Sequence, residues 1–220
     1  MNAGRVTAGL RRLAARITGD AIVLFARLIT APRTVWQGIE PVPRQRIYFA
    51  NHTSNGDFVL AWASLPEAMR RRTRPVAAAD YWLTTPLRSF VGKEAFRAVL
   101  IDRNPETRTE DPVAQMVAAL DEGASLILFP EGNRNMGPDP LLPFRTGLFH
   151  VATRRPDVDL VPTWIENLNA ILPKGEVIPL PLLCTVTFGK PVHLRPDEEK
   201  DVFLTRARNA LLALKPKDDA

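Results

Sequence analysis

Short apolar runs alternate with segments of helical periodicity along this chain, and no other feature constrains its fold as strongly. The clearest apolar run covers residues 125–129, with the sequence SLILF. Further strand-like runs lie at residues 46–50, 75–79, 98–101, 160–165 and 184–188. Helical patterns occupy residues 57–65, 87–96, 112–122, 144–153 and 197–214. This alternation predicts an α/β fold, a single domain with a mainly parallel central sheet flanked by helices.

The composition is that of a folded domain. The chain has 220 residues, of which 45% are hydrophobic. This length suffices to bury a sizeable core, and the hydrophobic content argues against a disordered protein. The single cysteine, Cys184, excludes an internal disulfide bond and any zinc site built from several cysteines. A chain without disulfides suits a reducing compartment.

An amphipathic helix is predicted near the N-terminus, over residues 4–30. Its apolar side chains recur at steps of three and four on one face: Val6, Leu10, Leu13, Ile17, Ala21, Leu24 and Leu28. Arg5, Arg12 and Arg16 flank this face. Arg27 interrupts an apolar run that is far shorter than the roughly 20 residues needed to cross a bilayer. The apolar run is also short for a signal peptide, and no cleavage pattern follows it.

Positive charge is concentrated in the same segment. Residues 1–46 hold eight arginines and two acidic residues, whereas the rest of the chain holds 21 basic and 22 acidic residues. Such a segment indicates an anionic partner, either a membrane surface or a nucleic acid. We expect a membrane-associating helix at residues 1–34 and a main domain at 35–220, on the cytoplasmic face of a membrane as a peripheral or monotopic protein. A helix packed on its own domain is the open alternative.

Three of the predicted strands end in loops with polar or charged side chains. Asn51 and His52 follow the run at 46–50, Asp102 and Arg103 follow the run at 98–101, and the sequence EGNR follows the run at 125–129. In α/β proteins, ligands collect at the carboxyl ends of parallel strands. The three loops should therefore line one crevice.

The residue types in these loops suit a particular chemistry. His52 can accept a proton while Asp57 holds its other ring nitrogen. Arginines such as Arg103 and Arg134 bind phosphate through paired hydrogen bonds, and Gly132 allows a ligand close to the backbone. Together they predict a substrate that bears an alcohol and a phosphate. Taken alone, the stretch at 48–57 fits equally well a helix N-cap formed by Ser54 or Asn55.

Four sequence blocks then match, in order, the blocks of a known family. His52 and Asp57 form a His-x4-Asp block, and Arg103 ends the second block. The third block is FPEGNR at 129–134, and the fourth is the Val-Pro pair at 161–162. The sequence FRTG at 144–147 also resembles a Phe-Lys-x-Gly segment of that family. With these blocks the chain resembles the glycerophospholipid acyltransferases typified by 1-acylglycerol-3-phosphate acyltransferase.

The resemblance implies an O-acyltransferase of phospholipid biosynthesis. Such an enzyme moves a fatty acyl group from acyl-CoA or acyl-carrier protein to the free hydroxyl of a lysophospholipid. The default acceptor is 1-acyl-sn-glycerol 3-phosphate, and the product is then phosphatidic acid. Acyl-CoA or the acyl-carrier protein is a co-substrate, and no cofactor or metal is expected.

The resemblance also assigns roles to individual residues. His52 would be the general base, and Asp57 would orient it and stabilise the imidazolium. Arg103 and Arg134 would hold the acceptor phosphate. Glu131 and Gly132 would belong to the same phosphate-binding pocket and shape it. Asn51 and Asn133 would be supporting residues, and Asn51 would help to fix the loop.

Two positions depart from the family pattern. Arg97 replaces the glycine that often opens the second block, and Asn133 replaces a threonine in the third. Neither change touches the residues assigned to proton transfer. Arg97 leaves the details of the phosphate pocket open, so another lysolipid such as a lyso-ornithine lipid stays possible as acceptor.

Two other classes of protein explain the sequence less well than an enzyme does. A nucleic-acid-binding protein would account for the sequence pI of about 9.8, but it leaves the His, Asp, Glu and Arg residues at the strand ends unexplained and lacks interleaved aromatic residues. We therefore expect no nucleic-acid partner. A non-catalytic membrane-binding scaffold is disfavoured by the intact His52 and Asp57 pair.

The basic run at 70–74 is either a solvated turn or a docking patch, and His150 is expected to be a packed helix residue.

Overall fold

Seven strands form one sheet in a computed structural model of the chain, which describes residues 3–104, 106, 108–166 and 184–216. The strands are β1 (Arg33–Trp36), β2 (Arg46–Ala50), β3 (Thr73–Ala78), β4 (Val99–Ile101), β5 (Ser125–Leu128), β6 (Asp159–Glu166) and β7 (Thr185–Phe188). Their order across the sheet is β1-β7-β6-β2-β5-β3-β4. Only the pairing of β6 with β7 is antiparallel among these neighbours. The predicted mainly parallel sheet is confirmed.

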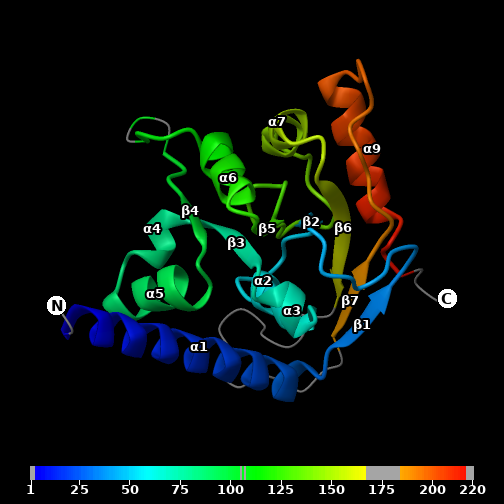
Figure 1. The fold of residues 1–220 in the computed structure, drawn as a ribbon. Helices are drawn as coiled ribbons and strands as arrows, with labels where there is room; N and C mark the ends of the chain where they lie inside the picture. Colours follow the sequence, from blue (N-terminus) through cyan, green and yellow to red (C-terminus); the bar gives the residue numbers. More distant parts are fainter. Residues whose placement is uncertain (1–2, 105, 107, 167–183, 217–220) are drawn as a thin grey trace.

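Helices cover both faces of this sheet (Figure 1). On one face lie α6 (Pro112–Asp121), α7 (Gly147–Arg154) and α9 (Lys200–Leu212). On the other lie α1 (Ala3–Thr30), α2 (Asp57–Ser64), α3 (Glu67–Arg70) and the turns α4 (Ala79–Trp82), α5 (Pro86–Phe90) and η1 (Val91–Ala95). The predicted single α/β domain preceded by an N-terminal helix is therefore confirmed.

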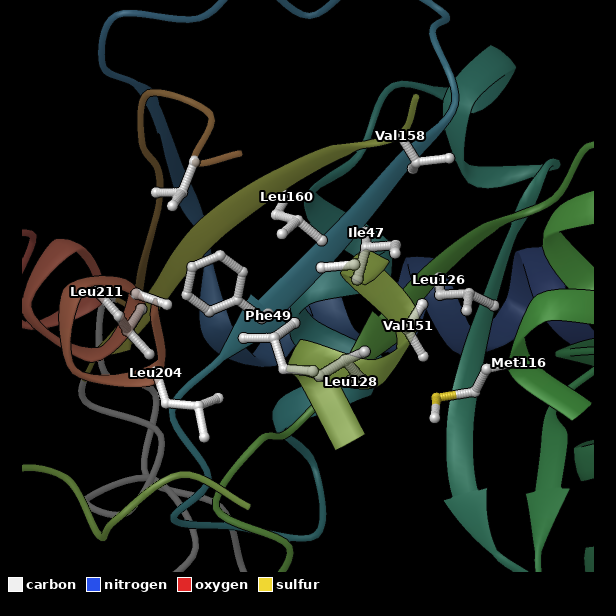
Figure 2. Packing of buried hydrophobic residues seen from close by; sticks show 14 of the residues in the cluster. Ile47, Phe49, Met116, Leu126, Leu128, Val151, Val158, Leu160, Leu204 and Leu211 are labelled. Carbon is white, nitrogen blue, oxygen red and sulfur yellow. The ribbon is translucent and has the colours of Figure 1, made fainter. Parts of the chain in front are cut away.

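β2 is the centre of the core because β6 and β5 flank it and both of its faces are covered. Alternate residues of a strand point to opposite faces. Accordingly Ile47 and Phe49 pack toward α7 and α9, while Tyr48 and Ala50 pack toward α1 and α2. Figure 2 shows Phe49 beside Leu204 and Leu211 of α9. A strand buried on both faces gives a rigid base for the loop that follows it.

α1 covers almost the span predicted from its periodicity. Ala15 and Val23 are buried against the domain, and Gly19 lies close to the ring of Trp62. At the end of the helix, Arg27 donates to the carbonyl of Ala63 at 3.0 Å. Among the described residues no helix is long and apolar enough to span a bilayer.

The structure departs from the sequence prediction in several elements. β1 was not predicted, because four residues with no clear alternation give little signal before they pair with β7. The helix predicted at 87–96 is α5 followed by the π-helical turn η1. The helix predicted from residue 144 begins only at Gly147, since the backbone N–H of Arg145 bonds to the carbonyl of Pro130. The proline-containing segment at 167–181, between the strand-like runs at 160–165 and 184–188, lies outside the described residues.

Arg97, which stands where the family often has glycine, has a φ of 52°. Only glycine adopts this left-handed region without cost, so the backbone here is strained. Its carbonyl accepts a hydrogen bond from Nε of Arg74 at 2.6 Å.

The basic run at 70–74 is mostly held by the protein itself. Arg70 is buried, bonds to the carbonyl of Leu65 and lies 5.5 Å from the ring centre of Trp62. Arg71 pairs with Glu67, and Arg74 pairs with Glu122 at 2.8 Å. These contacts are structural and do not support a docking patch.

Candidate active site

The carboxyl ends of the parallel strands β2, β5, β3 and β4 lie at one edge of the sheet. Three of them, β2, β5 and β4, are followed by a loop that carries residues singled out in the sequence. The loop after β2 holds His52, the loop after β5 holds Glu131 to Arg134, and the loop after β4 holds Arg103. The sheet topology thus places these three loops at one edge, as predicted.

His52 and Asp57 form a direct hydrogen bond of 2.9 Å between Nδ1 and Oδ2. Asp57 is fully buried, whereas 21% of the His52 side chain is exposed. Because Nδ1 is occupied by the carboxylate, Nε2 is the ring nitrogen left to meet a substrate. Phe129 stacks on the imidazole with 4.2 Å between ring centres, which further fixes the ring plane.

Asp57 also braces the loop that carries His52. Its Oδ2 accepts hydrogen bonds from the backbone N–H groups of Thr53 at 2.6 Å and Ser54 at 2.8 Å. It is the first residue of α2, where the helix dipole favours a negative charge. Gly56 is the N-cap and no side chain caps this helix, so the capping role considered for Ser54 or Asn55 is not seen. Oδ1 is buried without a hydrogen-bond partner among the described residues.

The backbone of His52 is held on both sides by the loop after β5. Its N–H donates to Oε1 of Glu131 at 2.8 Å, and its carbonyl accepts from the N–H of Asn135 at 2.6 Å. Asn51 adds a further tie, since its amide exchanges two hydrogen bonds with the backbone of Ile165 at 2.9 and 2.7 Å. The position of the imidazole is therefore set by three strands at once.

Glu131 is a buried strut between two loops. Its second oxygen, Oε2, accepts the N–H of Leu142 at 2.7 Å. Burial raises the pKa of this carboxyl group, and the two backbone hydrogen bonds, from Leu142 and His52, oppose that rise. Both oxygens thus face backbone donors of the protein. The hydrogen bonds of Glu131 tie the loop of His52 to Leu142, and its part in a phosphate pocket stays a prediction.

Gly132 has a φ of 73°, in the left-handed region that glycine tolerates best. A Cβ at this position would collide with Nε and Cδ of Arg145. The stem of Arg145 therefore occupies the space that a side chain at residue 132 would need. With its amide oriented to satisfy its neighbours, Asn133 donates to the carbonyl of Gly132 at 3.0 Å and accepts from Nη2 of Arg145 at 3.1 Å.

The two predicted phosphate ligands lie in different settings. Arg134 is exposed in the loop next to His52. Arg103 pairs with Asp80 at 2.7 Å, and both side chains are more than half exposed. β4, which leads to Arg103, is three places from β2 in the sheet, or about 14 Å at the usual strand spacing.

His150 is exposed on α7 and touches the ring of Phe149, so the prediction of a packed residue was wrong. No cluster of His, Cys, Asp and Glu among the described residues could hold a metal ion.

Comparison with known proteins decides the family. The model of the Acyltransferase family matches residues 33–166, which is more than half of the chain. The chain belongs to the Acyltransferase family. The region matched includes every residue of the site described above.

Two curated relatives are similar to this chain over part of their length. The 1-acyl-sn-glycerol-3-phosphate acyltransferase of Escherichia coli K12 is 33% identical over 159 residues, which cover 66% of this chain and 59% of that protein. The protein of the same name from Cocos nucifera is 29% identical, over 76% of this chain and 52% of that protein. This chain thus aligns with little more than half the length of these curated relatives.

A solved structure shares the fold of this chain. The 1-acyl-sn-glycerophosphate acyltransferase PlsC from Thermotoga maritima superposes with a TM-score of 0.66 at 21% sequence identity. The superposition covers 96% of this chain and 85% of that one. This likeness extends to the part of the chain that contains α1.

Some contacts of the site carried no signal in the sequence. Asp80 follows three alanines and gave no hint that it would pair with Arg103, a partner 23 residues away. The Leu142 bond to Glu131 and the Asn135 bond to His52 are made by backbone groups, which any residue type provides. Arg145 stood out in the sequence only as part of the FRTG segment at 144–147. Sequence spacing does not predict that its side chain passes over Gly132.

Proposed function

We propose that this chain transfers a fatty acyl group from acyl-CoA or acyl-carrier protein to the free hydroxyl of a lysophospholipid. The acceptor we favour is 1-acyl-sn-glycerol 3-phosphate, which gives phosphatidic acid. The observation that carries the proposal is the 2.9 Å pair of His52 and Asp57 beside a loop that bears arginines. The names of the relatives from Escherichia coli and Cocos nucifera support this choice of acceptor.

The reaction follows from the geometry of the pair. Nε2 of His52 takes the proton of the acceptor hydroxyl as its oxygen forms a bond to the thioester carbonyl carbon. The buried carboxylate of Asp57 stabilises the imidazolium that results. As the tetrahedral intermediate collapses, the carbon–sulfur bond breaks and the thiolate takes the proton from His52. The products are the acyl ester and the free thiol.

The arginines at the same edge suit the acceptor phosphate. Arg134 lies in the loop that directly contacts His52, and guanidinium groups bind phosphate through charge-assisted hydrogen bonds. Arg103 can contribute by exchanging Asp80 for the phosphate, since an exposed ion pair contributes at most about 1 kcal/mol. In this proposal the phosphate sets the acceptor in register with His52.

An acyl-transfer assay on a panel of lysolipids tests the proposal. The panel should include 1-acyl-sn-glycerol 3-phosphate, other lysophospholipids and a lyso-ornithine lipid, each with acyl-CoA and with acyl-carrier protein as donor. We expect turnover with a phosphate-bearing acceptor in the wild type and none in His52→Ala. The proposal is wrong if the wild type releases no thiol with any acceptor, or if the His52→Ala variant matches the wild type.

The exposed face of α1 supports a place for this reaction at a membrane surface. The apolar residues predicted on one face of the helix point to solvent, and with Phe25 the large ones are 54–73% exposed. A contiguous apolar face of this length is rarely left in water. Arg12 and Arg16 are exposed on the same helix, where they can meet anionic headgroups. We propose that α1 lies in the membrane interface and brings the domain to its lipid acceptor.

Charges placed on that face should abolish binding to vesicles. Each buried Leu or Ile contributes about 1.5–3 kcal/mol, so Leu13→Glu with Ile17→Glu should weaken binding by at least about 10²-fold. Flotation with vesicles that contain phosphatidylglycerol measures the effect. Val202→Glu is the matched control, because Val202 is equally exposed but lies on α9. Equal loss in the control, or unchanged flotation of the α1 variant, would argue against the interfacial helix.

A further inference from the structure

Both the backbone and the side chain of Arg145 contact the loop that supports His52. Its backbone N–H donates to the carbonyl of Pro130 at 2.8 Å, so the two segments run side by side at this point. Its side chain then crosses Gly132 at the place where any other residue would carry a Cβ. The left-handed glycine of the FPEGNR block and Arg145 thus form one unit.

The guanidinium of Arg145 is held but not neutralised. Its hydrogen-bond partner is the neutral amide of Asn133, at 3.1 Å. No carboxylate of the described part of the chain lies within ion-pair distance of it, and the side chain is exposed. Arg154 and Arg155, a short way along the chain, pair with Asp111, Asp121 and Asp157. A fixed, unpaired arginine at the active edge is suited to an anionic ligand.

The sheet order places Arg145 closer to the reacting group than Arg103. Pro130 and Gly132 belong to the loop after β5, and β5 is the direct neighbour of β2, which carries His52. Arg103 follows β4, three strands away, and is paired with Asp80. The reacting hydroxyl and the phosphate of the favoured acceptor sit on neighbouring carbons of one glycerol. At least one ligand of this phosphate should therefore lie near His52.

We propose that Arg145 binds the acceptor phosphate and, together with Arg134, fixes the acceptor relative to His52. This inference deepens the proposed function and rests on it for the identity of the acceptor. Gly132 is then required because the arginine stem must pass over it to reach the phosphate. The other role open to Arg145 is a purely structural clamp on the loop, and the two roles differ in how they depend on the acceptor.

Kinetics with two acceptors separate these roles. A lost charge-assisted contact to phosphate should raise the KM for 1-acyl-sn-glycerol 3-phosphate about 10- to 100-fold in Arg145→Met. The same variant should turn over 1-acylglycerol, which lacks the phosphate, at the wild-type rate. Arg145→Lys keeps the charge but loses the planar guanidinium, so its KM for 1-acyl-sn-glycerol 3-phosphate should lie between those of the wild type and Arg145→Met. Arg154→Met, an equal loss of charge on α7, should leave both KM values unchanged.

Binding of sn-glycerol 3-phosphate provides a second readout that needs no acyl transfer. Isothermal titration should give a Kd about 10- to 100-fold weaker in Arg145→Met than in the wild type and in Arg154→Met. An equal Kd in Arg145→Met and wild type would overturn the inference, as would a parallel loss of turnover with both acceptors. Absence of acyl transfer in the wild type would instead remove the proposed function, and the titration would still decide whether Arg145 binds the phosphate.

Discussion

Replacement of His52 by alanine should lower kcat/KM for acyl transfer by about 10⁴-fold, the upper end of what a general base contributes. The structure gives the reason for so large an effect. The imidazole is oriented by Asp57 through Nδ1 and by the ring of Phe129, so its whole arrangement serves to present Nε2. Without the imidazole, no other described histidine takes its place, since His150 is exposed on α7 and His193 pairs with Asp159.

The fold should survive this replacement. The backbone hydrogen bonds of residue 52, to Glu131 and from Asn135, remain in the variant, and the side-chain bond to Asp57 is lost. Thiol release measures activity, and circular dichroism with a thermal melt checks the fold. His150→Ala removes an imidazole of the same size from an exposed position and should behave as wild type. Activity of His52→Ala within tenfold of the wild type would show that proton transfer does not depend on His52.

Local patterns predicted much of the fold because the strongest elements are specified by their own residues. β2 and β5 are short, fully buried and apolar, and both were predicted to within one residue. α6 was predicted to within one residue, and the side chain of its N-cap Asp111 accepts the N–H of Val113. β1 was missed because its order comes from pairing with β7, a partner about 150 residues away in the sequence.

The grouping of apolar residues on one face of α1 was also predicted from periodicity alone. The seven residues grouped on one face by their spacing are the residues that point away from the domain. Helical geometry settles which side chains share a face, but it does not say which face is buried. The structure shows that the small residues Ala15 and Gly19 pack on the domain, where they allow close approach to Trp62.

In the site, the sequence predicted the pairing of His52 with Asp57 better than the contacts that hold the other residues. His52 and Asp57 are five residues apart, so a single loop brings them together and their pairing follows from local spacing. The contacts of Glu131 depend on Leu142 and those of Arg103 depend on Asp80, and both partners are placed by tertiary structure. A sequence motif therefore names charged residues without telling which of them a neighbour already neutralises.

Asp57→Asn should slow acyl transfer by about 10³- to 10⁴-fold, as expected when a histidine base loses the carboxylate that stabilises its imidazolium. An amide oxygen at the position of Oδ2 can still accept the hydrogen bonds of Thr53, Ser54 and His52. The loop should therefore keep its shape while the charge is lost. Thiol release under saturating donor measures the rate, and near-normal turnover would leave Asp57 with a bracing role only.

The same variant should be less stable by about 1–3 kcal/mol. The amide nitrogen must take the position of Oδ1, which is buried and has no hydrogen-bond partner among the described residues. Two N–H groups without an acceptor would then be buried, and each unsatisfied group carries a desolvation penalty. Urea unfolding measures this loss. Asp121→Asn is the control, because Asp121 is exposed and forms only a surface ion pair with Arg155.

A double variant tests whether the charge of Asp57 acts only through His52 or also directly on the substrate. If Asp57 acts through the imidazole, the variant that combines Asp57→Asn with His52→Ala should be no slower than His52→Ala alone, because residues that act as a unit are not additive. A further loss of tenfold or more would mean that the carboxylate has a separate effect on the substrate. The buried position of Asp57, behind His52 and at the start of α2, favours the first outcome, since the carboxylate reaches the substrate only through the imidazole ring.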